Sequence, residues 1–151
     1  MAQNAAPLDL LRRESRSLVQ RLRLWTPARF AAAAPSWPGG AGTRGDLVHH
    51  LAQCFADRAG DLEGRPRAPL PRLDSDLGLA DQLAVTSDDL VRCPPGDAVA
   101  VAGTAHLLAH RGDLLDEEVP PGLAASLGLT DVAAAGREAC RRSTEAGHPV
   151  G

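Results

Sequence analysis

The sequence of 151 residues contains no lysine, no isoleucine and no tyrosine, and all 16 of its basic residues are arginine. Without lysine the chain cannot form a lysine Schiff base or a P-loop phosphate site, and without tyrosine it has no phenol to act as a general acid. A GC-rich genome accounts for the excess of Ala, Arg, Gly and Pro. The side chains left for polar chemistry are His, Arg, Asp, Glu, Ser, Thr and Cys.

Aromatic residues are scarce, and basic charge is not in excess. The aromatic residues are Trp25, Trp37, Phe30 and Phe55, and the net charge is −3 with an isoelectric point near 5.9. Nucleic-acid binding favours a basic surface with aromatic groups for stacking, so we expect no nucleic-acid partner. No run of 18 apolar residues could span a membrane, and residues 1–7 lack the basic and apolar parts of a secretion signal. We therefore expect no membrane partner and a cytoplasmic protein.

The three cysteines, Cys54, Cys93 and Cys140, are odd in number and widely spaced, and no CxxC pair occurs. This pattern is typical of reduced thiols rather than of a disulfide framework. A hydrophobic fraction of 44% is enough for an ordinary core. The length then predicts a single domain over residues 1–151.

Apolar residues recur at helical spacing through most of the chain. The first stripe runs from Leu8 through Leu22 to Trp25, with Phe30 beside it. Further helices are expected at about 45–62, 77–91 and 97–116, and a last one from 123 or 130 to about 144; Pro/Gly-rich loops such as 35–42 separate them. No segment shows the alternation of a strand. The fold class is therefore all-α, a four-helix bundle with room for a short fifth helix at the C-terminal end.

Four of the five histidines lie in two of the predicted helices. His106 and His110 are four residues apart, so their imidazoles share one helical face at the spacing of two ligands on one metal. A purely structural pair has the same spacing, but a neutral imidazole buried in this apolar segment needs a partner. His49 and His50 are adjacent and point about 100° apart, so both cannot face one site.

Several neighbours of these histidines have two interpretations each. Cys54 lies one turn after His50 and could be a thiolate ligand or a small core residue. Asp113 could orient a ligand imidazole or form a surface pair, and Asp46 could orient His50 or, like Thr43, cap its helix. Arg111, next to His110, is expected to point away from the ligand face.

The chain contains the segment Leu47-Val-His-His50-Leu-Ala, then a middle interrupted by Pro and Gly, and then His106-xxx-His110-Arg-xx-Asp-Leu. In this order these features resemble the DinB-like superfamily of metal-binding four-helix bundles. The nearest branch contains the metal-binding domain of mycothiol-dependent maleylpyruvate isomerase. The resemblance covers about residues 8–129 and implies an up-down bundle with a long crossover. It also implies that His50, His106 and His110 bind a divalent metal; His50 is preferred to His49 because the family's ligand directly precedes the Leu-Ala pair.

Two positions differ from the nearest branch. The isomerase branch usually has glutamate at the position of His106, whereas three histidines are similar to the wider DinB-like group. An aspartate often found in that wider group is Gln53 here. The resemblance therefore implies a fold and a metal site more strongly than it implies isomerisation.

The resemblance implies a metal-dependent enzyme, with zinc as the first choice and nickel or iron as alternatives. The metal would activate water or a low-molecular-weight, mycothiol-like thiol for attack on a small electrophilic substrate, as in a thiol transferase or an isomerase. One alternative is a biosynthetic or detoxification enzyme that uses the metal as a Lewis acid, or histidine as a base, without a thiol. Another is a non-enzymatic helical binding or stress protein with a structural histidine cluster. The catalytic residues, the substrate and the choice between monomer and homodimer stay open.

Overall fold

A computed structural model describes residues 6–35, 42–93, 95–119 and 121–147, and this part of the chain is helical with one isolated bridge between Ala33 and Thr43. The all-α prediction is confirmed. The predicted loop at 36–41 and the tail beyond 147 lie outside the described residues. The helices are α1 (Pro7–Leu22), α2 (Pro27–Ala31), α3 (Arg44–Glu63), the 3-10 helix η1 (Asp76–Gly78), α4 (Leu79–Arg92), α5 (Asp97–Leu115), α6 (Pro121–Ser126) and α7 (Val132–Gly147).

The first predicted helix differs from the structure. The next three match α3, α4 and α5 to within a few residues, and the alternative that begins at 130 likewise matches α7. Helix α1 ends at Leu22, because the chain turns there and Pro27 begins a new helix that Thr26 caps. Trp25 and Phe30 still reach the core, where their ring centroids lie 5.0 Å apart. The short fifth helix expected at the C-terminal end is longer than expected, since α7 spans 16 residues.

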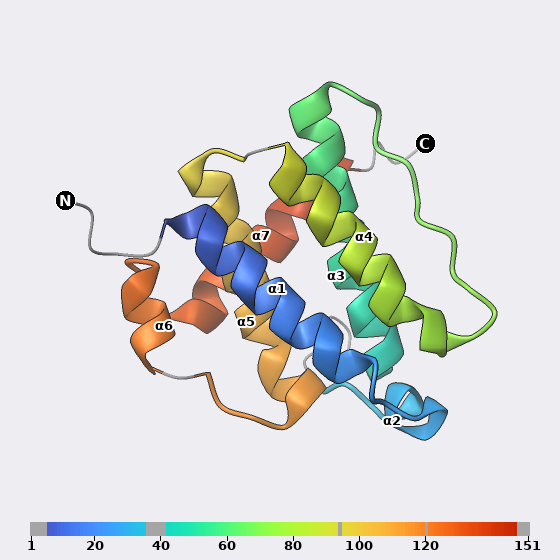
Figure 1. Ribbon diagram of the computed structural model, residues 1–151. Helices are drawn as coiled ribbons and strands as arrows, with labels where there is room; N and C mark the ends of the chain where they lie inside the picture. Colours follow the sequence, from blue (N-terminus) through green and yellow to red (C-terminus); the bar gives the residue numbers. More distant parts are fainter. Residues whose placement is uncertain (1–5, 36–41, 94, 120, 148–151) are drawn as a thin grey trace.

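The helices pack around one hydrophobic core (Figure 1). Helices α1 and α3 each pack against both α4 and α5, so the order around the core is α1, α4, α3, α5. Helix α7 lies against α5 and also contacts α3. A linker of residues 64–75 runs along the outside of the molecule from the end of α3 to η1. The largest fully buried side chains are Phe30, Phe55, Leu10, Leu11, Leu22, Leu47, Leu51, Leu79, Leu83, Leu90, Leu107 and Leu108.

Local sequence sets both ends of α3. The Thr43 hydroxyl accepts a hydrogen bond from the Asp46 backbone N–H at 3.0 Å, and the Thr43 N–H donates to Asp46 Oδ2 at 2.9 Å. This reciprocal capping box confirms the expected helix start. Gly64 ends the helix with φ 70°, a left-handed conformation that glycine adopts without strain. Asp46 also pairs with Arg72 at 3.0 Å, and the Thr43 hydrogen bonds and the Arg72 charge lower its pKa.

Small side chains let α7 approach α5 closely. A Cβ atom added to Gly136 would lie 2.2 Å from Ala109 Cβ and 2.8 Å from the Ala105 carbonyl oxygen, so this contact requires glycine. The other buried residues among the described side chains of α7 are Val132 and Ala139, which give the helix little apolar surface to bury. Cys140 follows Gly136 by one turn, so the close approach brings it toward α5.

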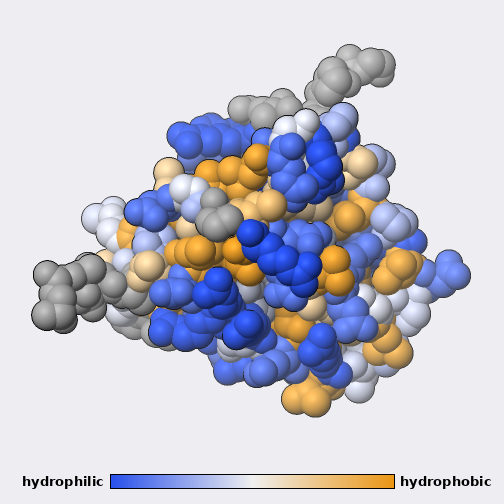
Figure 2. Space-filling model, turned by 45° about the horizontal axis from the view of Figure 1, so that its top comes forward, coloured by the Kyte–Doolittle hydropathy of each residue, from blue (hydrophilic) through white to orange (hydrophobic). Residues whose placement is uncertain are grey.

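The described surface mixes apolar and charged side chains. In the face that Figure 2 shows, apolar patches are separated by strongly hydrophilic residues. The large exposed apolar side chains are dispersed over several elements, the most exposed being Leu24 and Val85. No helix within the described ranges has both the length and the apolar character needed to cross a membrane.

Candidate metal centre

Three helices bring the predicted histidines and one cysteine together. His50 comes from α3, His106 and His110 from α5, and Cys140 from α7. The ring centroids lie 5.0 Å apart for His106 and His110, 5.3 Å for His50 and His106, and 6.2 Å for His50 and His110. One nitrogen from each ring and the Cys140 sulfur all lie within 4.8 Å of one another. Such a convergence of nitrogen and sulfur donors is typical of transition-metal sites.

The two histidines of α5 are buried without hydrogen bonds. His106 is 0% exposed and His110 is 7% exposed, and none of their four ring nitrogens has a hydrogen-bond partner among the described residues. Buried polar groups in folded proteins are normally hydrogen-bonded, and one unmet group costs about 1–3 kcal/mol. A metal ion would give one nitrogen of each ring the partner that the described residues do not provide, so the residues fit such an ion.

Burial keeps all three imidazoles in the form that binds metals. Burial, together with the charges of His110 and Arg58, lowers the pKa of His106 to about 2. Burial and the charge of His50 lower the pKa of His110 to about 4. The pKa of His50 is lowered by burial and by the charges of Arg58 and His49. At pH 7 the three rings are therefore neutral, with lone pairs available to a cation.

The structure adds Cys140 to the predicted ligands and leaves Cys54 outside the group. Cys140 Sγ lies 3.0 Å from His50 Nε2, whereas Cys54 Sγ lies 3.7 Å from the same nitrogen and is buried within the α3 side of the core. The sequence leaves Cys54, one helical turn after His50, as either a thiolate ligand or a small core residue, and its burial fits the core residue. Cys140 is 90 residues from His50, and only the docking of α7 on α5 reveals it. The one available signal was its position a turn after Gly136 in a helix rich in small residues.

His49 and Gln53 hold the linker that follows α3. A ring nitrogen of His49 lies 3.2 Å from the Leu70 carbonyl oxygen. The Gln53 amide donates to the Ala68 carbonyl at 3.0 Å and to Asp57 at 2.9 Å, and its oxygen accepts from the Leu70 N–H. The residue at the family's aspartate position thus has a structural role here.

Arg111 and Asp113 flank His110 differently. Arg111 pairs with Glu14 of α1 at 3.0 Å, so it points away from the histidines as expected. The negative charge of Asp113 acts to raise the pKa of His110, against the effect of burial. Neither ring nitrogen of His110 accepts or donates a hydrogen bond within the described part of the chain, so Asp113 acts through its charge. Its role in orienting the ring stays a prediction.

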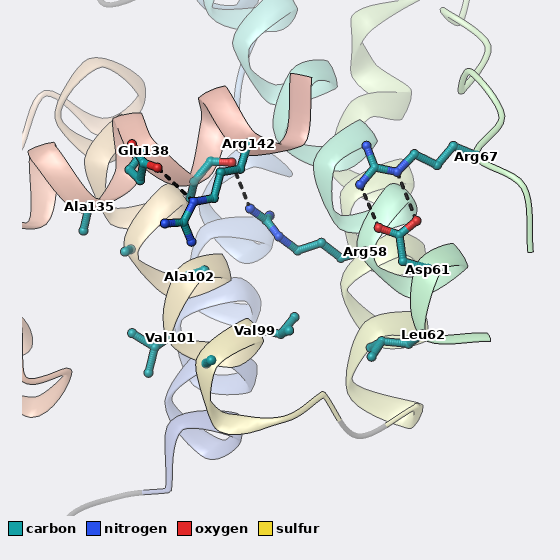
Figure 3. Close-up of a pocket in the computed structure, with 13 residues that line it drawn as sticks. Arg58, Asp61, Leu62, Arg67, Val99, Val101, Ala102, Ala135, Glu138 and Arg142 are labelled. Carbon is teal, nitrogen blue, oxygen red and sulfur yellow. Dashed lines mark hydrogen bonds and ion pairs between the residues drawn. The ribbon is translucent and has the colours of Figure 1, made fainter. Parts of the chain in front are cut away.

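A cavity of about 560 Å³ lies beside the cluster, between α3, α5 and α7 (Figure 3). Its lining is largely alanine and valine, with charged groups at the edge. Arg67 pairs with Asp61 at 2.7 Å, and Arg142 pairs with Glu138 at 2.8 Å. These two arginines of the lining are therefore already engaged with carboxylates.

Arg58 lines this cavity, and its charge acts on two of the histidines. Its Nη2 donates to the Ala139 carbonyl at 3.3 Å, and its Nη1 is buried without a hydrogen-bond partner among the described residues. Burial lowers the pKa of the Arg58 guanidinium, and its charge in turn lowers the pKa of His50 and His106. A partly desolvated cation at this position favours an anionic group nearby.

The cavity and the cluster adjoin one another along α5 and α7. The lining includes Ala105 and Ala139, the chain neighbours of His106 and Cys140.

Comparison of the chain with protein-family models, with curated proteins and with solved structures finds no match. The function is therefore inferred from the geometry of this site and from the resemblance of its motifs.

Proposed function

We propose that this chain is a metal-dependent enzyme of the DinB-like type, in which His50, His106 and His110 hold a divalent cation. The observation that carries the proposal is the burial of the His106 and His110 rings without hydrogen-bond partners among the described residues, with the His50 ring centroid 5.3 and 6.2 Å from theirs. In an empty site these nitrogens destabilise the fold, and a bound cation would offset part of that cost by binding one nitrogen of each ring.

The packing of the helices supports the DinB-like interpretation. The ring of α1, α4, α3 and α5 is the arrangement expected of a four-helix bundle, with α7 added on its outside. In chain order the histidine ligands come from the second helix of that ring, α3, and from a later one, α5; in the family that the motifs resemble, a second-helix histidine likewise joins two ligands on a later helix. Imidazole donors suit zinc, nickel and iron, and zinc is the first choice because it accepts imidazole and thiolate ligands together.

The side chains around the site suit a small electrophilic substrate. When bound, the cation would lower the pKa of a water or of a mycothiol-like thiol and so supply a nucleophile near pH 7. Arg58 would hold an anionic group of the substrate at the inner end of the cavity, and the alanine and valine lining would exclude water from its apolar part. The activity proposed is that of a thiol transferase or an isomerase.

Metal content tests the proposal. Protein purified without chelators and offered zinc, nickel or iron should hold a stoichiometric amount of one of them, and a His106→Ala/His110→Ala variant should hold none. His49→Ala is the matched control, because His49 lies on α3 but contacts the Leu70 carbonyl instead of the cluster. Wild-type protein that takes up no stoichiometric metal refutes the proposal. With metal bound, turnover of an electrophile that needs no added thiol favours the Lewis-acid alternative.

The fourth donor, Cys140, favours a second function, a structural metal centre in a non-enzymatic protein. Structural zinc sites are closed by four protein ligands, whereas catalytic sites keep an open position. Such a centre would raise thermal stability, by about 4 kcal/mol at a metal concentration 1,000 times the dissociation constant, without any turnover. If neither added zinc nor His50→Ala changes thermal stability, the histidine cluster is structural without metal.

A further inference from the structure

We infer that Cys140 is the fourth protein ligand of the metal, binding through Sγ and thereby fastening α7 to α3 and α5. The inference depends on the metal binding proposed above, and it adds a ligand that neither the histidine spacing nor the family resemblance supplies. With Cys140 bound, a tetrahedral site has no open position, so the inference favours the structural metal centre over the catalytic one. It rests on the position of one sulfur atom among three imidazoles, on the way α7 is held there, and on the charge of the site.

The distances match a single four-ligand site. The four donor atoms lie within 4.8 Å of one another, and Cys140 Sγ is 3.0 Å from His50 Nε2. Two ligands of a tetrahedral zinc ion lie about 3.4 Å apart, given bonds of about 2.0–2.3 Å. Small side-chain rotations are therefore enough to close the group around one ion, without movement of the helices.

The fold holds Cys140 in this position from two sides. Gly136, one turn earlier, packs so closely on Ala105 and Ala109 that α7 cannot rotate or shift without a clash or a gap. From α3, Arg58 donates a hydrogen bond to the Ala139 carbonyl, the residue before Cys140. Since α7 buries few apolar side chains, these contacts and the ligand bond together determine where it docks.

Charge also favours a thiolate at this position. Imidazole ligands bind metals as neutral groups, so three of them leave both positive charges of a divalent ion uncompensated, and Arg58, hydrogen-bonded to the residue before Cys140, adds a third charge nearby. When Cys140 binds, its thiol proton passes to solvent and the thiolate offsets one of these charges. Cys54 is the less suitable sulfur, because it lies outside the group of four donors and 3.7 Å from His50 Nε2.

Cobalt(II) is the probe that reports a sulfur ligand directly. The full chain is stripped of metal and loaded with Co²⁺, and its absorption is recorded for wild type, Cys140→Ser and Cys54→Ser. Wild type should show a thiolate-to-cobalt charge-transfer band in the near ultraviolet, and Cys54→Ser should keep it. Cys140→Ser should still bind Co²⁺ through its histidines but lose the band, and its affinity should fall by at least about tenfold, as for ligand-sphere changes in general.

The outcomes separate this inference from the proposed function. Stoichiometric Co²⁺ without a charge-transfer band in wild type leaves the histidine site standing and overturns the role of Cys140. A band that persists in Cys140→Ser, or that disappears in Cys54→Ser instead, also overturns it. No Co²⁺ binding by wild type refutes the proposed function, and this inference with it.

Alkylation of the wild-type protein tests the inference without any variant. Zn²⁺ should slow the reaction of Cys140 with iodoacetamide by about tenfold or more, because a metal-bound thiolate is a poorer nucleophile and is shielded. Cys93, which lies away from the site and contacts Glu63, is the internal control and should react at the same rate with and without Zn²⁺. Equal rates for Cys140 in both conditions, measured by mass spectrometry, overturn the inference.

Discussion

The close packing of α7 on α5 predicts that Gly136→Ala damages both stability and the metal site. The added methyl carbon would lie 2.2 Å from Ala109 Cβ and 2.8 Å from the Ala105 carbonyl oxygen. Carbon atoms pack best at about 3.5–4.0 Å, so α7 must move away from α5 by more than about 1 Å. Neither neighbour can give way, because one is a methyl group with no rotamer and the other is helix backbone.

Two effects of opposite sign decide how much Gly136→Ala changes the free energy of unfolding. Alanine in a helix interior is more favourable than glycine by about 1 kcal/mol, whereas overpacking a tight contact costs about 1–3 kcal/mol. We expect a net loss of up to about 2 kcal/mol in the free energy of unfolding. The outward shift of α7 carries Cys140 with it, which opens the 3.0 Å contact between its Sγ and His50 Nε2. Metal ligand distances tolerate only about 0.2 Å, so Cys140 should be lost from the site.

Gly112→Ala is the matched control for this prediction. Gly112 also lies inside a helix, but a Cβ added there would meet only the Glu117 carbonyl oxygen at 3.5 Å, an ordinary contact. This variant should gain up to about 1 kcal/mol from helix propensity. Urea denaturation of the metal-free proteins measures both changes, and the cobalt charge-transfer band reports the sulfur ligand. The reasoning is refuted if Gly136→Ala is as stable as Gly112→Ala and keeps the full band.

Three further predictions concern the metal-free protein. First, burial lowers the pKa of His106 to about 2 and that of His110 to about 4 in the folded protein, from about 6.5 in the unfolded chain. Below pH 6.5 the unfolded chain therefore binds more protons than the folded protein does. Urea denaturation should show stability falling from pH 6.5 toward pH 4, by up to about 1.4 kcal/mol per pH unit for each histidine; a flat profile contradicts this. Second, His106→Leu should abolish metal binding and raise metal-free stability at pH 7 by about 1 kcal/mol or more, because it removes a buried imidazole that has no hydrogen-bond partner among the described residues. A loss of stability would show that the His106 ring is hydrogen-bonded in the native protein. Third, hydrogen exchange should be faster in α7 than in α3 without metal, and Zn²⁺ should slow it selectively in α7 of wild type but not of Cys140→Ser.

Local features of the sequence predict most of the helices and much of the site. The capping box of Thr43 and Asp46 needs only residues three apart, and it begins α3 where expected. His106 and His110 share a face because any helix places residues four apart together. The end of α1 was harder to predict, since the apolar spacing continues through Trp25. The chain turns after Leu22 and buries Trp25 from a loop, which periodicity alone cannot distinguish from a longer helix.

The sequence by itself determined that the chain is helical, that His106 and His110 lie together, and that only one of His49 and His50 can join them. The tertiary structure alone decided that Cys140 lies among these histidines and that Arg58 is placed where its charge acts on two of them. These contacts join α3, α5 and α7, and they depend on which helix faces dock and how closely. The fit of Gly136 against Ala105 and Ala109 sets that distance, and steric fit between helices far apart in the chain leaves no periodic trace in either segment.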